Sequence, residues 1–315
     1  MQIRPLHMAV VGAANIDIGG FPAGAVVMRD SNPGRIRMSA GGVGRNIACN
    51  LARLGVQVQL VTALGGDAFA AAVRDDCAAA GVALDLAMRF PEESSSTYLY
   101  IADAAGDMQL AVNDMEICTR ITPEALFGCL DALYDMDAVV IDANLPEATI
   151  AFLAQNMRAP LIADAVSAVK ARRLLSALPR LRAIKPNALE ASALTGQPVY
   201  DRATAGSAAM KLVTMGVQRV FITLGERGVC CADASGARFL PGVPIQMASA
   251  TGAGDAFTAA LAWADACGAD LCDCALAGLA AAALTASSPE TVDQGMTEAA
   301  LIRRIEDIRS QISGL

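Results

Sequence analysis

The stretch Ser249 to Phe257, with the sequence SATGAGDAF, brings two glycines and an acid together before an Ala-rich run. Gly252 and Gly254 can adopt positive φ and expose their N–H groups, and residues 256–266 are predicted to form the helix they open. An anion there would meet N–H donors and the favourable end of the helix dipole. Asp255 could accept a proton from a hydroxyl while the amides hold negative oxygens. The pattern favours phosphoryl transfer to an alcohol, although alone it also fits a glycine turn with an Asp cap.

A second glycine motif, Gly41-Gly42-Val43-Gly44-Arg45-Asn46, precedes an amphipathic run. Gly41 and Gly42 would let a ligand lie against the backbone, and Asn46 in the first helical turn offers both a donor and an acceptor. A flexible loop is the alternative. The motif gains weight because it would lie beside the polar end of the first strand.

The first strand, predicted from Met8, runs into Asn15 and Asp17. A dinucleotide-binding G-x-G-x-x-G is excluded because positions 14 and 17 hold Ala and Asp, and the chain also lacks a P-loop. Side chains such as Asn15 and Asp17 suit vicinal hydroxyls, and open α/β sheets bind ligands at the carboxyl ends of their strands. An Asx turn would explain the same two residues.

Two more motifs follow predicted strands. In KPNALE, Asn187 and Glu190 are three apart on one helical face, where they could contact phosphate oxygens or water around Mg²⁺; a capping pair is equally compatible. In TLGERG, Thr223 is followed by Gly225 and Gly228, which could admit a flat base or a phosphate. Alone, this second motif is also typical of a hairpin turn.

Composition narrows the class of protein. The 315 residues are 54% hydrophobic, enough for a large core. A net charge of −8 without any Lys/Arg block argues against nucleic-acid binding. His7, the only histidine, precedes the predicted first strand, which disfavours histidine-based catalysis, and we interpret His7 as structural or incidental.

The nine cysteines form neither a disulfide framework nor a CxxC metal site, so we interpret them as core thiols in a reducing cytoplasm. The start of the chain shows no export signal. Mean hydropathy is +0.43, and the most apolar region, residues 256–286, is interrupted by three aspartates and dominated by alanine. Two buried helices explain it better than a membrane crossing.

Short β-branched runs alternate with helical patterns along the chain, which predicts a mostly parallel sheet covered by helices. The predicted strands are Met8–Val11, Gln57–Thr62, Ala138–Ile141, Pro160–Ala163, Ala183–Lys185 and Arg219–Thr223. The predicted helices are Arg45–Leu54, Ala68–Ala80, Pro123–Leu133, Leu189–Leu194, Thr204–Met215 and Ala256–Cys267.

Two segments break this rhythm, residues 18–40 and about 95–114. Both alternate around turn residues, and the second is predicted to be a hairpin with its turn at Ala104–Asp107. Because an isolated hairpin is marginal, we expect the two segments to pair into one small sheet that covers a cleft. The alternative is that they extend the edge of the main sheet. An exposed small sheet would also suit a homodimer formed by edge pairing.

Together, GGVGRN, KPNALE, TLGERG and ATGAGDAF, in this order, resemble the ribokinase-type carbohydrate and nucleoside kinases, the PfkB family. The resemblance covers nearly the whole chain and implies one kinase domain over residues 1–315. Its expected fold is a ribokinase-like three-layer α/β/α sandwich with a β-sheet lid. It implies ATP and Mg²⁺ as cofactors, and leaves open a K⁺ site near the loop at residue 250 and residues 284–290.

The resemblance also implies roles for the motif residues. Asp255 would be the catalytic base, and Gly252, Ala253 and Gly254 would form the anion hole. The nucleotide and metal residues would be Asn187, Thr223, Gly225, Gly228 and, for Mg²⁺, Glu190. The acceptor residues would be Asn15, Asp17, Gly41, Gly42 and Asn46.

Within the family, three local strings are similar to pseudouridine kinases: NIDIGG at residue 15, the segment from Gly106 to Met115, and DAVSxxK ending at Lys170, which has Ala165 where Pro is usual. This predicts a 5′-kinase for a nucleoside, pseudouridine first, with the lid and Lys170 near the uracil ring. Asn144, where sugar kinases often carry an acid, points the same way. A ribokinase, a fructokinase, another nucleoside kinase and a non-catalytic nucleoside sensor remain as alternatives. A nicotinamide-dependent oxidoreductase is disfavoured because this chain lacks the complete glycine fingerprint of that class.

Overall fold

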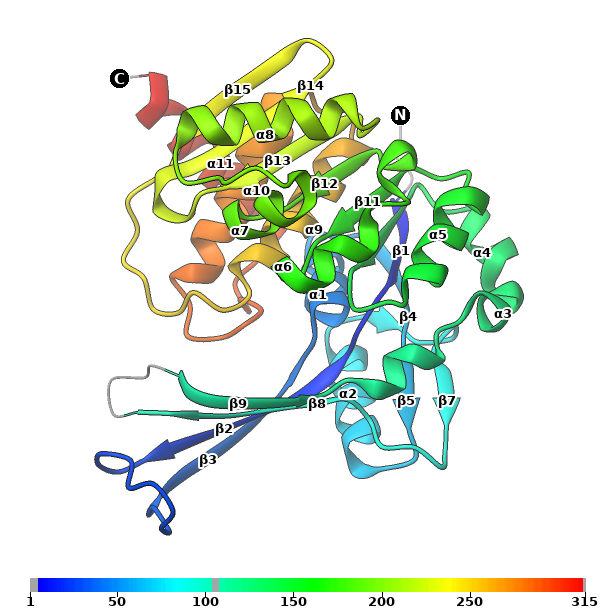
Figure 1. Ribbon diagram of the computed structural model, residues 1–315, viewed down its shortest axis with the longest axis vertical. Helices are drawn as coiled ribbons and strands as arrows, with labels where there is room; N and C mark the ends of the chain where they lie inside the picture. The colour runs from blue at the N-terminus through cyan, green and yellow to red at the C-terminus, as the bar shows by residue number, and fades with distance from the viewer. Residues whose placement is uncertain (1–4, 104–107, 314–315) are drawn as a thin grey trace.

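The computed structural model describes residues 5–103 and 108–313. A large twisted sheet lies between helices, and a smaller sheet extends away from it (Figure 1). The strands are β1 (His7–Val11), β2 (Asn15–Pro22), β3 (Gly34–Gly41), β4 (Gln57–Val61), β5 (Ala63–Gly65), β6 (Val82–Ala83), β7 (Met88–Phe90), β8 (Thr97–Ala102), β9 (Met108–Asp114), β10 (Ala138–Asp142), β11 (Leu161–Asp164), β12 (Ala183–Lys185), β13 (Arg219–Thr223), β14 (Gly228–Asp233) and β15 (Gly236–Pro241).

The α-helices are α1 (Val43–Arg53), α2 (Ala68–Ala79), α3 (Pro123–Leu126), α4 (Leu130–Tyr134), α5 (Glu147–Asn156), α6 (Ala168–Ala171), α7 (Ala188–Thr195), α8 (Arg202–Thr214), α9 (Ala253–Ala266), α10 (Leu271–Ala286) and α11 (Glu298–Ser313). The predicted helix Pro123–Leu133 is wrong as a single element: a 3₁₀ turn at Phe127–Cys129 separates α3 from α4, with Gly128 inside the break. The predicted start of α9 at Ala256 is also wrong, because the helix begins three residues earlier.

The main sheet has the order β15-β14-β13-β12-β11-β10-β1-β4-β6 and is parallel from β13 to β6, with β14 and β15 antiparallel at one edge. Successive side chains of a strand point to opposite faces, so β1 contributes to two cores. Met8 and Val10 pack with α1, α9 and α10, while Ala9 and Val11 pack on the side of α5, α7 and α8. The mostly parallel sheet covered by helices that the alternation predicts is confirmed, as is the three-layer sandwich that the resemblance implies.

The smaller sheet, called the lid here, has the order β3-β2-β8-β9. Two antiparallel hairpins, β2–β3 and β8–β9, are joined by the parallel pair β2–β8, in which Asp17 lies opposite Tyr98. The alternative that these segments extend the main sheet is therefore wrong. The first strand also ends earlier than the sequence suggests: β1 stops at Val11, and Asn15 and Asp17 belong to β2 of the lid. The turn predicted at residues 104–107 lies outside the described residues.

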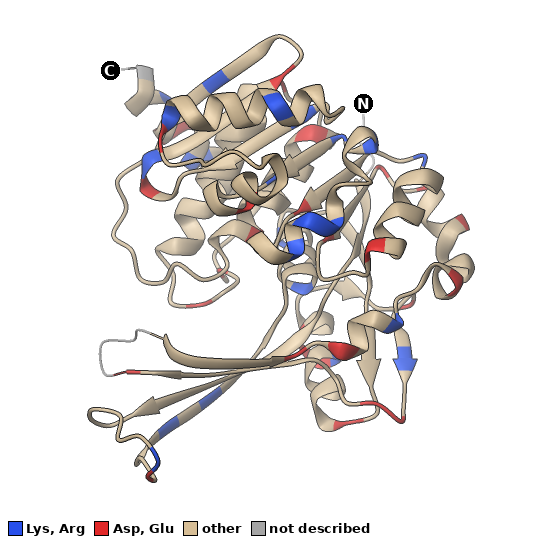
Figure 2. Ribbon diagram, in the orientation of Figure 1, with Lys and Arg blue, Asp and Glu red and all other residues tan. Residues whose placement is uncertain are grey.

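Charged residues of both signs are scattered over the main body in the view of Figure 2, with no block of one sign. Within the described ranges, no helix is both long enough and apolar enough to cross a membrane. The Ala-rich region around residue 270 instead forms α9 and α10, whose side chains are largely buried against each other and the sheet.

Candidate active site

The beginning of α9 requires a glycine. Gly252 has a φ of 83°, and a Cβ atom there would lie 2.0 Å from the carbonyl oxygen of Thr291. Only glycine satisfies both conditions. Because α9 starts at Ala253, the N–H groups of Ala253 and Gly254 belong to its first turn and have no partner within the helix. The helix therefore presents the N–H donors that the sequence predicts for an anion.

Asp255 follows directly in the same turn, and its Oδ2 accepts a hydrogen bond of 2.8 Å from Nδ2 of Asn46 on α1. Burial, and next the negative charge of Asp164, raise the pKa of Asp255 to about 7, while the bond from Asn46 and the charge of Lys185 act in the opposite direction. A carboxylate with a pKa near neutral is suited to accept a proton from a hydroxyl.

Three neighbouring strands end in charged residues: β10 at Asp142, β11 at Asp164 and β12 at Lys185. Lys185 Nζ lies 2.8 Å from Oδ2 of Asp164 and 3.3 Å from the carbonyl oxygen of Gly254. Asp164 Oδ2 also accepts from the hydroxyl of Thr258, one turn into α9, at 2.6 Å. This buried network fixes α9 against the carboxyl ends of the strands.

Sequence reasoning missed Asp142, Asp164 and Lys185 as site residues. The signal was available, because all three end consecutive strands at the edge where open α/β sheets bind ligands. Asp142 is fully buried and accepts from the backbone N–H groups of Ala13 and Asn144 at 2.8 Å each. Burial raises its pKa to about 6. Its hydrogen bonds join β10 to the segment between β1 and the lid.

The predicted acceptor residues meet at the base of the lid. Asn15 Nδ2 donates to Oδ1 of Asp17 at 2.7 Å, and Asn15 pairs across the lid sheet with Gly41. A Cβ on Gly41 would lie 2.2 Å from Asp17 Oδ2, so glycine leaves room for that carboxylate. Gly42, with a φ of 96°, then turns the chain into α1. Burial raises the pKa of Asp17.

Lys170 lies on the short helix α6, and its Nζ donates to Oδ1 of Asn144 at 2.6 Å; burial lowers its pKa. The loop before α6 is strained, since Val166 has a φ of 62°, a rare conformation for a β-branched residue. A hydrogen bond of 2.9 Å from its N–H to Asp164 Oδ1 holds that conformation. Strain of this kind costs about 1–3 kcal/mol and is concentrated at functional sites.

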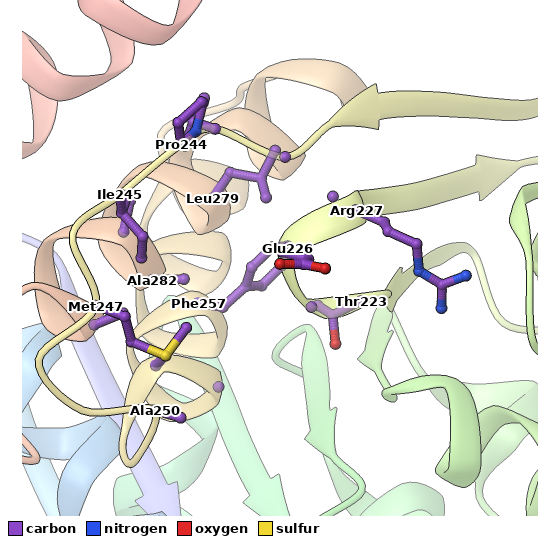
Figure 3. Close-up of a pocket in the computed structure, with 18 residues that line it drawn as sticks. Thr223, Glu226, Arg227, Pro244, Ile245, Met247, Ala250, Phe257, Leu279 and Ala282 are labelled. Atoms are coloured by element: carbon purple, nitrogen blue, oxygen red, sulfur yellow. The ribbon is translucent and has the colours of Figure 1, made fainter.

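A cavity of about 820 Å³ lies beside the N-terminal turns of α9 (Figure 3). It contains the predicted nucleotide residues Thr223, Gly225 and Gly228, and its other end reaches Ala253 and Gly254. Its remaining lining is mostly apolar: Glu226, Arg227, Gly242, Val243, Pro244, Ile245, Met247, Ala250, Phe257, Leu279, Ala282, Ala283 and Ala286.

Asn187 and Glu190 do not line this cavity. They form a capping box at the start of α7: Glu190 N–H donates to Asn187 Oδ1 at 2.9 Å, and Asn187 donates from its N–H and its Nδ2 to the two oxygens of Glu190. The capping interaction considered for this pair is thus present. Asn187 also bridges to Thr223, which places the pair directly beside the cavity residues.

Comparison with known proteins gives the family of the chain. The family model described as pfkB family carbohydrate kinase matches residues 6–298. Pseudouridine kinase from Escherichia coli K12 is 35% identical over 263 residues, which cover 82% of this chain and 84% of that protein. Ribokinase from Bacillus subtilis is 29% identical over 278 residues, covering 84% and 87%.

Among solved structures, a carbohydrate kinase from Agrobacterium tumefaciens superposes with a TM-score of 0.85 at 30% identity, covering 96% of this chain and 97% of that one. Arabidopsis thaliana ribokinase, solved with ribose and ATP, has a TM-score of 0.86 at 22% identity, covering 96% and 99%, and supports the fold alone. The match over residues 6–298 and the extent of the similarity show that the chain belongs to the pfkB family of carbohydrate kinases, with the ribokinase-like fold, and is a phosphotransferase acting on an alcohol group.

Proposed function

We propose that this kinase uses ATP to phosphorylate the 5′-hydroxyl of a ribosyl nucleoside, converting pseudouridine to pseudouridine 5′-phosphate. The observation that carries the proposal is the contact between Asn46 and Asp255, because it joins the polar acceptor residues to the α9 N-terminus at the end of the apolar cavity. A hydroxyl near Asp255 and a triphosphate in the cavity would then meet at one turn of helix.

In the reaction, Asp255 takes the proton of the 5′-hydroxyl, whose oxygen forms a bond to the γ-phosphorus. The bond from that phosphorus to the β–γ bridging oxygen breaks, and ADP leaves. The N–H groups of Gly252, Ala253 and Gly254 hold the negative oxygens of the transferred group. Lys185 and Thr258 keep these amides in place through Asp164 and the carbonyl of Gly254.

The cavity fits ATP: its apolar walls suit the purine, and Thr223, Gly225 and Gly228 offer close backbone approach. Glu190 fits a water-mediated role toward Mg²⁺, because each of its oxygens accepts only one hydrogen bond from Asn187 and keeps a lone pair. The bound ion would neutralise charge on phosphate oxygens. The chain shares its fold with a putative ribokinase II from E. coli whose structure contains ATP and Mg²⁺, which is compatible with this assignment.

A nucleoside acceptor is supported by the inner face of the lid, which carries Asp17. By the strand register, Tyr98, Tyr100 and Arg37 share that face. Tyr100 packs edge-on against Phe21 with ring centroids 6.0 Å apart, and no Cβ would fit at Gly19 beneath the Tyr100 ring. Aromatic rings next to the sugar-binding acid give a base a surface to stack on. Lys170, near Asn144, would approach the uracil from the main domain.

The acceptor is tested with a panel of nucleosides and sugars, including pseudouridine, uridine, adenosine, ribose and fructose, each incubated with Mg-ATP and analysed by mass spectrometry. We expect pseudouridine to give the highest kcat/KM. A higher value for ribose, fructose or adenosine would replace pseudouridine as the acceptor, and an absence of ADP release with every acceptor would favour a nucleoside sensor.

We further propose a homodimer through the lid; the sequence favours pairing of the lid edges, and the lid also exposes Ile36, Met38, Leu110 and Val112 on its outer face, which a partner lid would cover. Asp17 pairs with Ser39 and Tyr98, and side chains alternate along each strand, so these four side chains lie on the face away from Asp17. Ile36→Lys should shift the sedimentation coefficient from dimer to monomer, whereas Ile302→Lys on α11 should not. A monomeric unmodified protein would contradict this part.

Two smaller parts complete the proposal. The nine free cysteines suit a cytoplasmic location.

The N–H groups of Ala248 and Ser249 both donate to the carbonyl oxygen of Ala286, so the loop before α9 and the segment after α10 are held together. A K⁺ ion at this place would need several carbonyl oxygens as ligands. Initial rates in K⁺ and in choline buffers should then differ; equal rates would remove K⁺.

A further inference from the structure

We propose that Arg45, held by Asp76, is a positioning residue that fixes the side-chain amide of Asn46 so that its NH₂ group faces Asp255. This inference builds on the proposed role of Asp255 as the base. Arg45 is buried between α1 and α2; its Nε donates to Asp76 Oδ2 at 2.8 Å, and its Nη2 also contacts that oxygen. Its third nitrogen, Nη1, donates to Asn46 Oδ1 at 2.8 Å.

The chemistry of these groups leaves one orientation for the amide. A guanidinium group has N–H donors and no acceptor, so the atom of Asn46 that faces Arg45 must be the oxygen. The nitrogen then points the other way, where it donates to Asp255 Oδ2 at 2.8 Å. A reversed amide would present an N–H to the guanidinium and its oxygen to the carboxylate, and both contacts would be repulsive.

Arg45 itself has little freedom to move. Nη1 also donates to the carbonyl oxygen of Ala40 at 3.3 Å, and the backbone N–H of Arg45 donates to the carbonyl oxygen of Ala13 at 3.1 Å. A Cβ on the preceding Gly44 would lie 2.8 Å from the backbone of Gly12, so α1 approaches the end of β1 as closely as a glycine allows. The guanidinium is thereby anchored to the helix α2, the strand β3 and the amide at once.

The orientation matters because Asp255 lies among opposing charges. Asp164 and Asp142 disfavour its ionised form, as does burial, while Lys185 and the donated hydrogen bond from Asn46 favour it. Losing that bond should raise the pKa of Asp255, since a hydrogen bond to the charged form lowers it. Arg45 in turn faces Asp76, Cys49 and Cys77, and its charge also lowers the pKa of Asp17.

The test is the pH dependence of kcat for Arg45→Met. The unmodified enzyme should lose activity as the pH falls below about 7, because protonated Asp255 cannot accept a proton. In Arg45→Met this acidic limb should move to higher pH by about one unit, which is about a fivefold loss of activity at pH 7 that approaches tenfold at lower pH and is recovered under alkaline conditions. Arg45→Lys keeps a charge and a donor-only head, so it should restore part of the shift.

Matched variants separate the loss of amide positioning from a general loss of structure. Arg53 lies two turns further along α1 and donates to the backbone of Gln294, so Arg53→Met should leave the limb unchanged. In an Asn46→Ala background, Arg45→Met should produce no additional shift, because there is no amide left to orient. If Arg45→Met does not fold, Asp76→Asn, which keeps an acceptor but loses the charge, should give a smaller shift in the same direction.

An unchanged acidic limb in a folded Arg45→Met protein would overturn the inference, and so would an equal shift in the Asn46→Ala background, since Arg45 would then act without Asn46. Failure of the proposed base would be recognised differently: Asp255→Asn would turn over normally. The two outcomes are measured on different variants and are therefore distinguishable.

Discussion

The two halves of the proposed site are built by different means. The proposed acceptor half consists of polar side chains that contact each other: Asn15 with Asp17, Asn46 with Asp255, and Lys170 with Asn144. The proposed nucleotide half is a cavity of about 820 Å³ with mostly apolar walls and exposed glycine backbone. Sites that hydrogen-bond a substrate can reject analogues far more strongly than apolar pockets can. We therefore expect strict selection of the acceptor and weaker selection of the nucleotide base.

The largest effect should come from the residue at which the two halves meet. Asp255→Asn keeps the shape and a partner for Asn46 but removes the base, so kcat should fall by about 10² or more while the KM values change little. Steady-state kinetics for both substrates measure this. Asp273→Asn, on the surface of α10, is a matched control and should be silent in catalysis. Normal turnover of Asp255→Asn would mean that Asp255 is not the catalytic base.

A substitution confined to the acceptor half should change the kinetic constants for the acceptor only. Asp17→Ala removes a charged hydrogen-bond partner, worth about 10- to 100-fold in kcat/KM for the nucleoside, and should leave the KM for ATP as it is. Asp30→Ala, at the exposed tip of the lid, serves as the control. An equal loss toward both substrates would show that the halves are not separable.

The smallest effect is expected in the apolar half. Ala282→Leu adds volume to the wall of the nucleotide cavity on α10 and should raise the KM for ATP several-fold without changing the KM for the acceptor. Ala282→Ser, which alters polarity but hardly volume, should behave like the unmodified enzyme. If serine were the more harmful substitution, the walls would select by polarity rather than by shape.

Much of this arrangement could be predicted from local patterns. The alternation of strands and helices predicted the main sheet, and the two irregular segments predicted the lid. Gly252 was recognisable because positive φ at the start of a helix needs glycine, whereas Gly42 was recognised only for the close approach of a ligand, and its positive φ is seen in the structure. The sequence predicts the start of α9 three residues too far along the chain, because glycine is a poor helix former and Gly254 lies in the first turn.

The remainder depends on contacts between distant residues. The bond between Arg45 and Asp76 spans 31 positions, and the bond between Asn46 and Asp255 spans 209, so no local pattern contains either. Asn187 and Glu190 illustrate the opposite case. Their spacing alone was compatible with capping and with phosphate binding, and the capping box now visible on α7 leaves the second role as a proposal.

The first hairpin of the lid begins and ends among the proposed acceptor residues: β2 starts at Asn15, and β3 ends at Gly41, one residue before Gly42, the N-cap of α1. If these residues bind the acceptor as proposed, a rotation of the lid about its base would displace Asp17 relative to Asn46. The apparent affinity for the acceptor would then scale with the fraction of molecules whose lid has the binding orientation.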